Sequence, residues 1–482
     1  MMRTFRKISI SLAAVVAAVS VITTLPSPAQ ASGTKPLSAP IFTSKSAAKA
    51  KAHTPFAFTV KTKANPTASI AVGPLPPGLS FADNGNGTAT LSGTFPFAET
   101  QTISLTATNT QGSTPQTLSV VVKGLPGVRH VFVITLENKG YNETFGTPAN
   151  DPYLASTLPS QGALLKNYYG IGHFSNDNYI GLISGQPPNS STQSDCFGYA
   201  NFPPGDGLVN GIQQGAGCIY PSNVPSLPSQ LTSAGFSWKG YLEDMGNDPS
   251  RESATCGHPV VGSSDPSFFA TSTDGYATRH NPFVYFHSII DNTAVCNSQV
   301  VPLGTTGGAL PAGTPAGVTG LATDLQSVAT TPNFSVISPN LCNDGHDFPC
   351  KNPTGTSALA NIDTFLSTWV PLIENSPAFK QDGLLEITFD EAEAVGSATD
   401  ASACCGETPG PAADSGGNGI TGPGGGKVGT VLISPFITPG AVVAKKYNHY
   451  SSLASIEDLF GLPHLGEAAT VTSNFDKGIF HH

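Results

Sequence analysis

The sequence predicts an α/β domain with a mostly parallel central sheet flanked by helices, preceded by a small all-β sandwich. Three observations support this fold class. Short alternating strand-like runs, separated by Asn/Gly/Pro turns, fill the region before residue 124. After residue 128, longer apolar runs alternate with helix-like stretches. Several of those runs are apolar almost throughout, which is typical of strands buried on both faces of a parallel sheet.

The beginning of the chain is typical of a secretory signal peptide, predicted over residues 1–31. An apolar stretch covers residues 8–22, and Ala29-Gln30-Ala31 fits a cleavage site. A membrane anchor is the alternative, but the apolar run is short for a spanning helix. No later segment is apolar enough to span a bilayer, so we expect a secreted or cell-envelope protein without stable membrane insertion. The basic residues before the apolar stretch are Arg3, Arg6 and Lys7.

Composition narrows the classes of partner. Only 11% of the residues are charged, the net charge is −10, and no Lys/Arg block lies beyond the N-terminus, so a nucleic-acid partner is not expected. Eight cysteines in an exported chain suit disulfides, although the sequence leaves their pairing open. Cys342 and Cys350 are close enough to staple one loop. Cys404 and Cys405 resemble a soft-metal pair, but no His lies at ligand spacing, which favours disulfides.

Residues 32–50 are rich in Ser, Ala, Lys and Pro and are predicted to form a linker. Residues 51–124 are predicted to form the β-sandwich, because runs such as FAFTV, TATLSG and TLSVVV alternate between turns such as DNGNG. The stretch GPLPPGLSFADNGNGTATLSGT resembles the immunoglobulin-like (Ig-like) modules of many exported bacterial proteins. That resemblance implies a binding or spacer role, with attachment to a surface polymer as one option.

The stretch GLPGV marks the start of the second domain, predicted over residues 128–482. Helix-like stretches separate its strands, and helices are predicted over 361–375 and 451–461. Pro371 predicts a kink or break in the first of these helices. The second begins with Ser and ends with Gly. The strands are predicted over 130–136, 333–339, 383–389 and 428–436.

Polar residues directly follow three of these strands. Ligands gather at the carboxyl ends of strands in open α/β sheets, so separate strands bring these side chains to one rim. Clustered carboxylates repel one another, and a divalent cation relieves that repulsion. Taken singly, each cluster is more often a loop or helix cap, but three together favour a metal held by oxygen ligands. The residues are Glu137 and Asn138; Asp344, His346 and Asp347; and Asp390 and Glu391.

Ser175 is the candidate nucleophile. It precedes the helix-like NDNYIGLIS, which places its hydroxyl at an N-cap or in a first turn. Helix N-termini favour negative charge and bind phosphate. A serine there that touches a metal loses its proton more easily than a free hydroxyl does. Alone, Ser175 is a routine N-cap and His173 a satisfied loop histidine.

Several motifs, in this order, resemble the secreted bacterial and fungal phosphoesterase family. That family includes acid phosphatases and phospholipases C, and its catalytic domain is related to alkaline phosphatases. The resemblance covers roughly residues 128–465. It implies an alkaline-phosphatase-like fold and a phosphoserine mechanism assisted by one divalent metal ion, Mg, Ca, Mn or Zn. The motifs are HVFVITLENKGYNETFG, HFSNDNYIGLISG, PNLCNDGHD, ITFDEAE and YNHYSSLASIEDLFGL.

The resemblance also assigns roles to residues. Ser175 matches the nucleophile, and His346 or His449 is expected to protonate the leaving alcohol. For His280, pocket lining and a structural role are equal alternatives. The implied metal ligands are Glu137, Asn138, Ser175, Asp390 and Glu391. The residues expected to bind substrate are His173, Asn178, Asp344 and His280.

The expected function is hydrolysis of small phosphomonoesters by a secreted enzyme. A phospholipase C-type phosphodiesterase is one alternative, and a catalytically weak surface or adhesion protein is another. No G-x-S-x-G motif is present, which disfavours a serine hydrolase of the nucleophile-elbow kind.

The nucleophile motif departs from the family pattern His-Pro-Ser-x-Pro-Asn-Tyr. Phe174 and Asp177 stand where that pattern has proline. Because proline pre-sets a turn, its loss predicts a looser Ser175. Asp177 is also expected to add negative charge beside an incoming phosphate.

Overall fold

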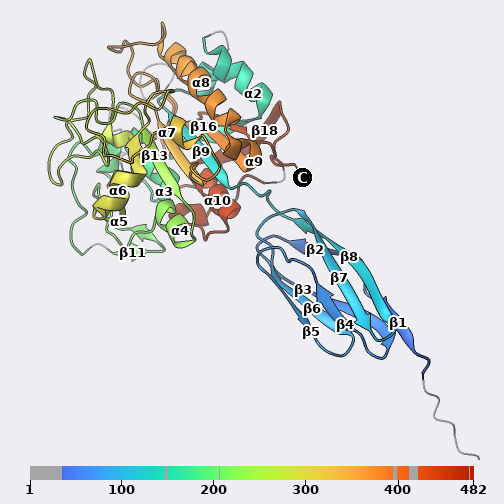
Figure 1. Ribbon diagram of the computed structural model, residues 1–482. Helices are drawn as coiled ribbons and strands as arrows, with labels where there is room; N and C mark the ends of the chain where they lie inside the picture. Colours follow the sequence, from blue (N-terminus) through green and yellow to red (C-terminus); the bar gives the residue numbers. More distant parts are fainter. Residues whose placement is uncertain are drawn as a thin grey trace, which may run out of the picture.

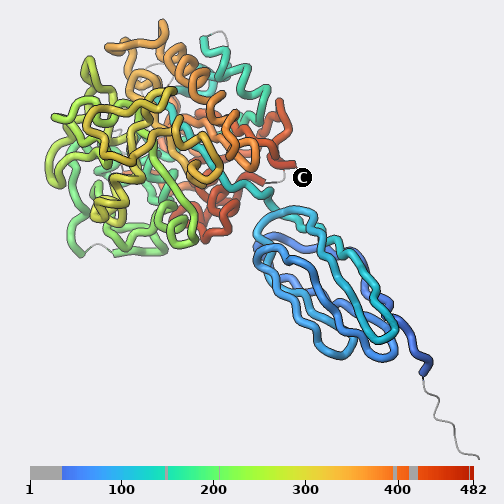
Figure 2. Tube along the Cα trace, viewed as in Figure 1, coloured from blue at the N-terminus to red at the C-terminus, as the bar shows by residue number. Residues whose placement is uncertain are grey.

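The chain forms two bodies, an elongated all-β module and a larger α/β body, which are joined end to end (Figures 1 and 2). The C-terminal end of the chain lies near their junction. The signal peptide predicted over residues 1–31 lies outside the described residues. The computed structural model describes residues 35–146, 150–205, 207–393, 399–411, 422–476 and 478–481.

The all-β module consists of two four-stranded sheets that share one apolar core. Their strand orders are β1-β3-β6-β5 and β2-β8-β7-β4. Val60 and Leu91 of one sheet and Ile103 and Val120 of the other are buried together. The strands are β1 (Ser38–Phe42), β2 (Ala47–Lys51), β3 (Pro55–Asn65), β4 (Ser69–Val72), β5 (Leu79–Asp83), β6 (Thr88–Thr94), β7 (Thr100–Asn109) and β8 (Gly112–Lys123).

β1 and all but the last residue of β2 lie inside the stretch predicted as a linker, residues 32–50, so that prediction needs correction. β1 pairs antiparallel with β3, and β2 pairs parallel with β8. Both are edge strands with many exposed residues. Their small and polar side chains give a weak strand signal, and pairing with a neighbouring strand determines their conformation.

Eight strands form the central sheet of the α/β body, in the order β14-β13-β15-β9-β16-β17-β10-β18. Neighbouring strands run parallel except in the two pairs that include β17. The predicted mostly parallel sheet is confirmed, with β17 as its antiparallel member. The strands are β9 (His130–Leu136), β10 (Ala163–Tyr169), β13 (Trp238–Leu242), β14 (Val300–Pro302), β15 (Phe334–Ser338), β16 (Gly383–Phe389), β17 (Thr430–Ile433) and β18 (Ala441–Asn448).

Helices cover both faces of this sheet (Figure 1). Pro371 lies inside α8 without ending it, so the predicted break is absent. A small two-stranded ribbon, β11 (Leu208–Val209) and β12 (Ile212–Gln213), stands apart. The α-helices are α1 (Tyr141–Thr144), α2 (Leu158–Gln161), α3 (Ser175–Ser184), α4 (Leu227–Ser233), α5 (His287–Ile290), α6 (Thr293–Gln299), α7 (Leu321–Asp324), α8 (Ala358–Asn375), α9 (Pro377–Asp382) and α10 (His449–Phe460).

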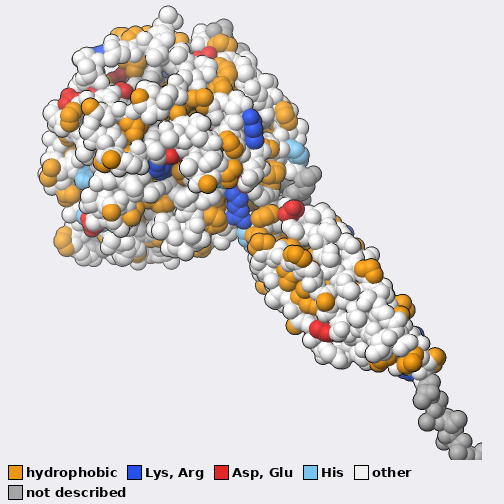
Figure 3. Space-filling model, in the orientation of Figure 1, with side chains coloured by type: hydrophobic (Ala, Val, Ile, Leu, Met, Phe, Trp, Pro, Cys, Tyr) orange, Lys and Arg blue, Asp and Glu red, His pale blue; other side chains and the backbone are white. Residues whose placement is uncertain are grey.

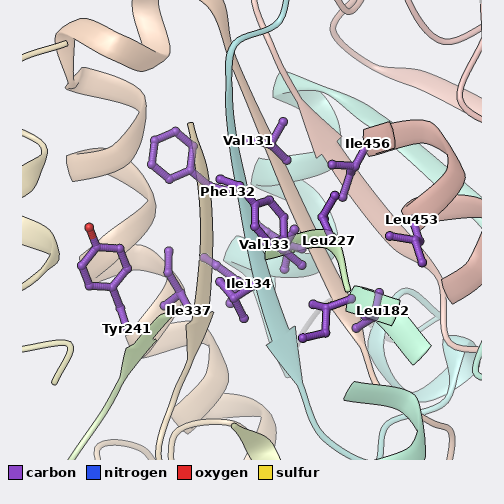
Figure 4. Close-up of a cluster of buried hydrophobic side chains, with 14 of the residues drawn as sticks. Val131, Phe132, Val133, Ile134, Leu182, Leu227, Tyr241, Ile337, Leu453 and Ile456 are labelled. Carbon is purple, nitrogen blue, oxygen red and sulfur yellow. The ribbon is translucent and has the colours of Figure 1, made fainter. Parts of the chain in front are cut away.

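The central strand β9 is buried along its whole length. Successive side chains of a strand point to opposite faces. Val133 lies on the face covered by α3 and α10, beside Leu182 and Ile456 (Figure 4). The Phe132 ring faces the other helical layer, with its centroid 6.4 Å from that of Phe379 in α9. Apolar side chains therefore fill both faces of this strand, and its polar neighbours follow where it ends.

The surface carries few charged side chains on the face that Figure 3 shows. The eight cysteines form four disulfides, and the predicted staple between Cys342 and Cys350 is confirmed. In the part of the chain that the structure describes, no helix is both long and apolar enough to cross a bilayer. The other bonds are Cys196–Cys218, Cys256–Cys296 and Cys404–Cys405.

Candidate active site

Three neighbouring parallel strands bring polar residues to one rim of the sheet. The carboxyl ends of β15, β9 and β16 meet because these strands lie side by side. The Glu137 N–H, after β9, donates to the carbonyl of Asp344 at 2.9 Å. The Asn138 N–H donates to Asp390 Oδ1, after β16, at 3.0 Å. The carboxyl groups of Glu137, Asp344 and Asp390 are all buried.

Ser175 meets this rim from helix α3. It is the first residue of the helix, and its Oγ donates to Glu137 Oε2 at 2.8 Å. The residue is 2% exposed. The positive end of a helix favours the alkoxide, and a carboxylate in contact with the hydroxyl can accept its proton. The structure therefore brings together the hydroxyl and one carboxylate of the predicted site.

The carboxyl groups around Ser175 are short of partners. Glu137 Oε1 and Asp390 Oδ2 are buried and have no hydrogen-bond partner among the described residues. Burial, with Asp390 and Asp344 nearby, raises the pKa of Glu137 well above its usual range. Burial also raises the pKa of Asp344 and of Asp390. A divalent cation supplies the missing partner for such oxygens, so these residues fit a hard or borderline cation.

His280 lies in the same cluster. Its Nδ1 is 3.1 Å from Asp344 Oδ2, and its Nε2 is 3.4 Å from Glu137 Oε1. One ligand atom from each of these three residues lies within 4.8 Å of the others, close enough to share an ion. The Tyr179 ring stacks on His280 with centroids 5.1 Å apart. Burial and nearby Arg279 lower the pKa of His280 well below its usual range, which favours the neutral ring that binds metals.

Glu391 makes different contacts. Its Oε2 accepts a hydrogen bond from the Phe174 N–H at 3.0 Å and lies 2.5 Å from His173 Nδ1. His173 Nε2 lies 2.9 Å from the carbonyl oxygen of Asp400. The structure therefore places Glu391, predicted as a metal ligand, and His173, predicted to bind substrate, in contacts that hold the turn before Ser175.

Asn178 closes the same turn. Its Oδ1 accepts from the Ile171 N–H at 2.8 Å, and its Nδ2 donates to the carbonyls of Gly172 at 3.0 Å and Phe174 at 3.1 Å. Both ends of the amide are therefore bonded to the protein's own backbone. The sequence had instead predicted that Asn178 binds substrate. These bonds brace the turn that carries Ser175, and they oppose the loosening expected from the missing prolines.

Asp177 is buried beneath the turn. It is 1% exposed and packs so closely on Gly172 that a Cβ there would come within 2.6 Å of Asp177 Oδ2. Burial and nearby Glu391 raise the pKa of Asp177 well above its usual range, which favours the neutral carboxyl. Both effects oppose the negative charge that was expected beside an incoming phosphate.

The backbone of Phe174 does not suit the first proline of the resembled motif. Phe174 has φ +89°, whereas the proline ring fixes φ near about −65°. We therefore expect Phe174→Pro to displace Ser175 and to lower kcat at least about a hundredfold. Phe174→Gly, which tolerates positive φ, is expected to keep kcat within about threefold. Steady-state phosphate release measures both variants, and equal activity of the two would contradict this explanation.

The two histidines predicted to move protons have different surroundings. His449 is fully buried, with Nδ1 3.1 Å from the Tyr168 hydroxyl and Nε2 2.6 Å from the Asp390 carbonyl oxygen. Burial lowers the pKa of His449 to about 4, so its ring is neutral at neutral pH and suits holding the Asp390 backbone. The His346 side chain is 28% exposed, and its Nδ1 lies 2.8 Å from Asp347 Oδ1. Of the two, only the His346 side chain is partly exposed to solvent.

Two residues that the sequence did not single out also lie beside Ser175. Asp195 Oδ1 accepts from the Asn176 N–H at 3.0 Å. Arg279 Nη2 lies 3.2 Å from His346 Nε2. The position of Arg279 next to His280 was the only sequence signal for it, and Asp195 had no signal of its own.

Residues 148–463 match the phosphoesterase family. A probable acid phosphatase of Kluyveromyces lactis is 25% identical over 70% of this chain and 59% of the relative. A phosphate-repressible acid phosphatase of Penicillium chrysogenum is 27% identical over 72% of this chain and 62% of the relative. A phosphatidylinositol-3-phosphatase of Mycobacterium tuberculosis is 25% identical over 74% of this chain and 85% of the relative. The chain therefore spans about three fifths of the length of these two fungal relatives.

The titin M3 domain, a solved structure, resembles a small part of the chain. The titin M3 domain covers 18% of this chain and 99% of its own length, at 22% identity and a TM-score of 0.16, which is too low to support an argument. The family match, by contrast, covers more than half of the sequence and includes Ser175, Asp344 and Asp390. The chain belongs to the phosphoesterase family.

Proposed function

We propose that this chain is an exported hydrolase of phosphoric esters, with Ser175 as its nucleophile and one divalent cation as its cofactor. The contact between Ser175 Oγ and Glu137 Oε2, at the positive end of α3, supports this proposal most strongly. Four disulfides agree with export. The proposal includes an alkaline-phosphatase-like architecture and an Ig-like character for the β-module, while attachment to a surface polymer stays a prediction.

The cation site is proposed to use Glu137, Asp344 and Asp390, with His280 or Asn138 as a further ligand. Glu137 Oε1 and Asp390 Oδ2, which accept no hydrogen bond from the described residues, support this choice. When bound, a divalent cation lowers the pKa of a nearby hydroxyl and offsets charge on phosphoryl oxygens. Its identity among Mg, Ca, Mn and Zn is left to metal analysis of the purified protein.

The side chains then have distinct tasks. Ser175 Oγ attacks phosphorus, the bond from phosphorus to the alcohol oxygen breaks, and a phosphoserine forms. Glu137, which already accepts the Ser175 hydrogen bond, takes the hydroxyl proton. His346 supplies a proton to the leaving alcohol. Water then attacks the phosphoserine and gives its proton to His346, the bond from phosphorus to Ser175 Oγ breaks, and Glu137 returns its proton to Ser175 as phosphate leaves. Glu391 and Asn178 keep the turn that carries Ser175 in place.

The substrates are proposed to be phosphomonoesters. Two of the relatives are named acid phosphatases, and the third is named for a phosphate monoester on a lipid headgroup. All three names describe removal of a terminal phosphate. A phospholipase C-type phosphodiesterase is the alternative that a substrate panel must separate.

The test measures phosphate or alcohol release by the purified full chain loaded with a divalent cation. The panel contains an aryl phosphate, vesicles with phosphatidylinositol 3-phosphate, a diaryl phosphate and a choline phospholipid. We expect at least about tenfold faster turnover of monoesters than of diesters, and loss of turnover on chelation that added metal reverses. Preference for a diester would favour the phosphodiesterase, and no turnover on any substrate would favour the catalytically weak surface protein.

A further inference from the structure

A carboxylate of the protein itself sits at the N-terminus of the helix that carries the nucleophile. Asp195 Oδ1 accepts from the N–H of Asn176, the second residue of the ten-residue helix α3. Helix N-termini bind anions, and phosphate is the common one. Asp195 reaches this place with a left-handed backbone, φ 52°, and the next residue, Cys196, is also left-handed at φ 50°. Two such residues in succession carry a conformational cost. The Cys196–Cys218 disulfide and surrounding contacts hold this backbone conformation in place.

A buried guanidinium lies beside the same carboxylate. Arg279 is 2% exposed, and its Nη1 donates to the carbonyl of Phe268 at 2.7 Å. Its Nη2 lies 3.2 Å from His346 Nε2. Its Nε has no hydrogen-bond partner within the described residues, and Asp195 Oδ2 lies 3.7 Å away, beyond hydrogen-bond reach. Arg279 therefore retains a buried donor close to the carboxyl group that occupies the helix N-terminus.

The Asp195 carboxyl group and the Arg279 guanidinium together indicate an anion-binding site that a side chain of the protein occupies. We propose that the Arg279 guanidinium and the N-terminus of α3 bind the terminal oxygens of the substrate's phosphoryl group, and that Asp195 fills this subsite in the free protein. The proposal rests on the proposed function, because it names a recognition subsite next to Ser175. Asp195 competes with substrate for the helix N-terminus, so it acts on binding rather than on the chemical step.

The arrangement also selects a class of ester. A guanidinium binds two oxygens of one phosphate through parallel N–H groups. A phosphomonoester keeps three terminal oxygens, so one remains available after two have been bound by Arg279. A diester has only two terminal oxygens for the helix N-terminus, Arg279 and the carboxylate rim together. Arg279 therefore favours monoesters.

The test compares Arg279→Lys, Arg279→Gln and Asp195→Asn with the metal-loaded full chain. Calorimetric titration with inorganic phosphate measures binding without relying on turnover, and KM for an aryl phosphate and a diaryl phosphate is measured in parallel. We expect Arg279→Gln to weaken phosphate binding at least about tenfold, Arg279→Lys to recover part of it, and Asp195→Asn to tighten it about threefold or more. Arg251→Gln is the matched control, because Arg251 is also buried and donates to backbone carbonyls away from Ser175.

Each outcome decides between a subsite and a plain buried ion pair. A lower melting temperature in Arg279→Gln, as in Arg251→Gln, with unchanged phosphate affinity would overturn the proposal. So would weaker phosphate binding in Asp195→Asn, or no phosphate binding by the unmodified protein. Phosphate binding that depends on Arg279, in a protein that hydrolyses no ester, would uphold the subsite and reject the proposed function.

Discussion

Replacing Ser175 with Ala is expected to lower kcat for an aryl phosphate at least about a thousandfold. Ser175 Oγ is the hydroxyl that the structure places on the carboxylate rim, 2.8 Å from Glu137 Oε2. Without it, no phosphoserine forms, and the acids and helix N-terminus stabilise only direct attack by water. The measurement is phosphate release at saturating substrate, with mass spectrometry of an acid-quenched reaction to locate phosphate on residue 175 in the unmodified protein.

Ser184→Ala is the matched control for this substitution. Ser184 lies at the other end of α3, is buried, and donates to the carbonyl of Ile180 at 2.7 Å. Its loss removes a buried hydroxyl from the same helix without touching the rim, so turnover is expected to stay within about threefold. Turnover by Ser175→Ala that matches this control would reject Ser175 as the nucleophile and leave the carboxylate rim without a partner.

The parts of the fold that sequence could predict are those where burial alone determines conformation. β9 and β16 begin and end at the predicted residues, because both faces of each strand are covered and every position is buried. β18 was missed, because its exposed Lys445 and Lys446 obscure the strand pattern of an edge. β1 and β2 were missed because their small and polar side chains give a weak strand signal. Edge strands depend on a partner's backbone, which a local pattern does not contain.

The site shows a similar division. Residues at the ends of central strands, such as Glu137 and Asp390, were predictable because the sheet fixes where they point. The orientation of the Glu391 side chain was not predictable, because it depends on contacts with His173 and Phe174 from a distant loop. Arg279 and Asp195 belong to long loops with little secondary structure, where only the folded chain reveals which side chains meet.

Glu137→Gln is expected to abolish turnover and to make the metal-free protein more stable. Glu137 is a buried carboxyl beside two others, and burial raises its pKa well above the ordinary value of 4.5. A group whose folded-state pKa is raised stabilises the fold below its unfolded-state pKa and loses that contribution as pH rises. The neutral amide avoids this penalty. The gain over the unmodified metal-free protein is therefore expected to grow above about pH 4.5, to roughly 1–3 kcal/mol.

Metal analysis distinguishes loss of the cation site in Glu137→Gln from loss of the folded structure. Bound cation per chain is measured on the purified proteins, and melting temperatures are measured with and without added cation. The unmodified protein is expected to be stabilised by cation, and Glu137→Gln is expected to bind none and to gain nothing from it. Glu457→Gln is the matched control, because burial raises the pKa of Glu457 in α10 to about 9. That variant should also gain stability as pH rises yet keep its metal and its turnover, since of these two glutamates only Glu137 contacts Ser175. A Glu137→Gln protein that still binds the cation would instead move the metal site away from this carboxylate.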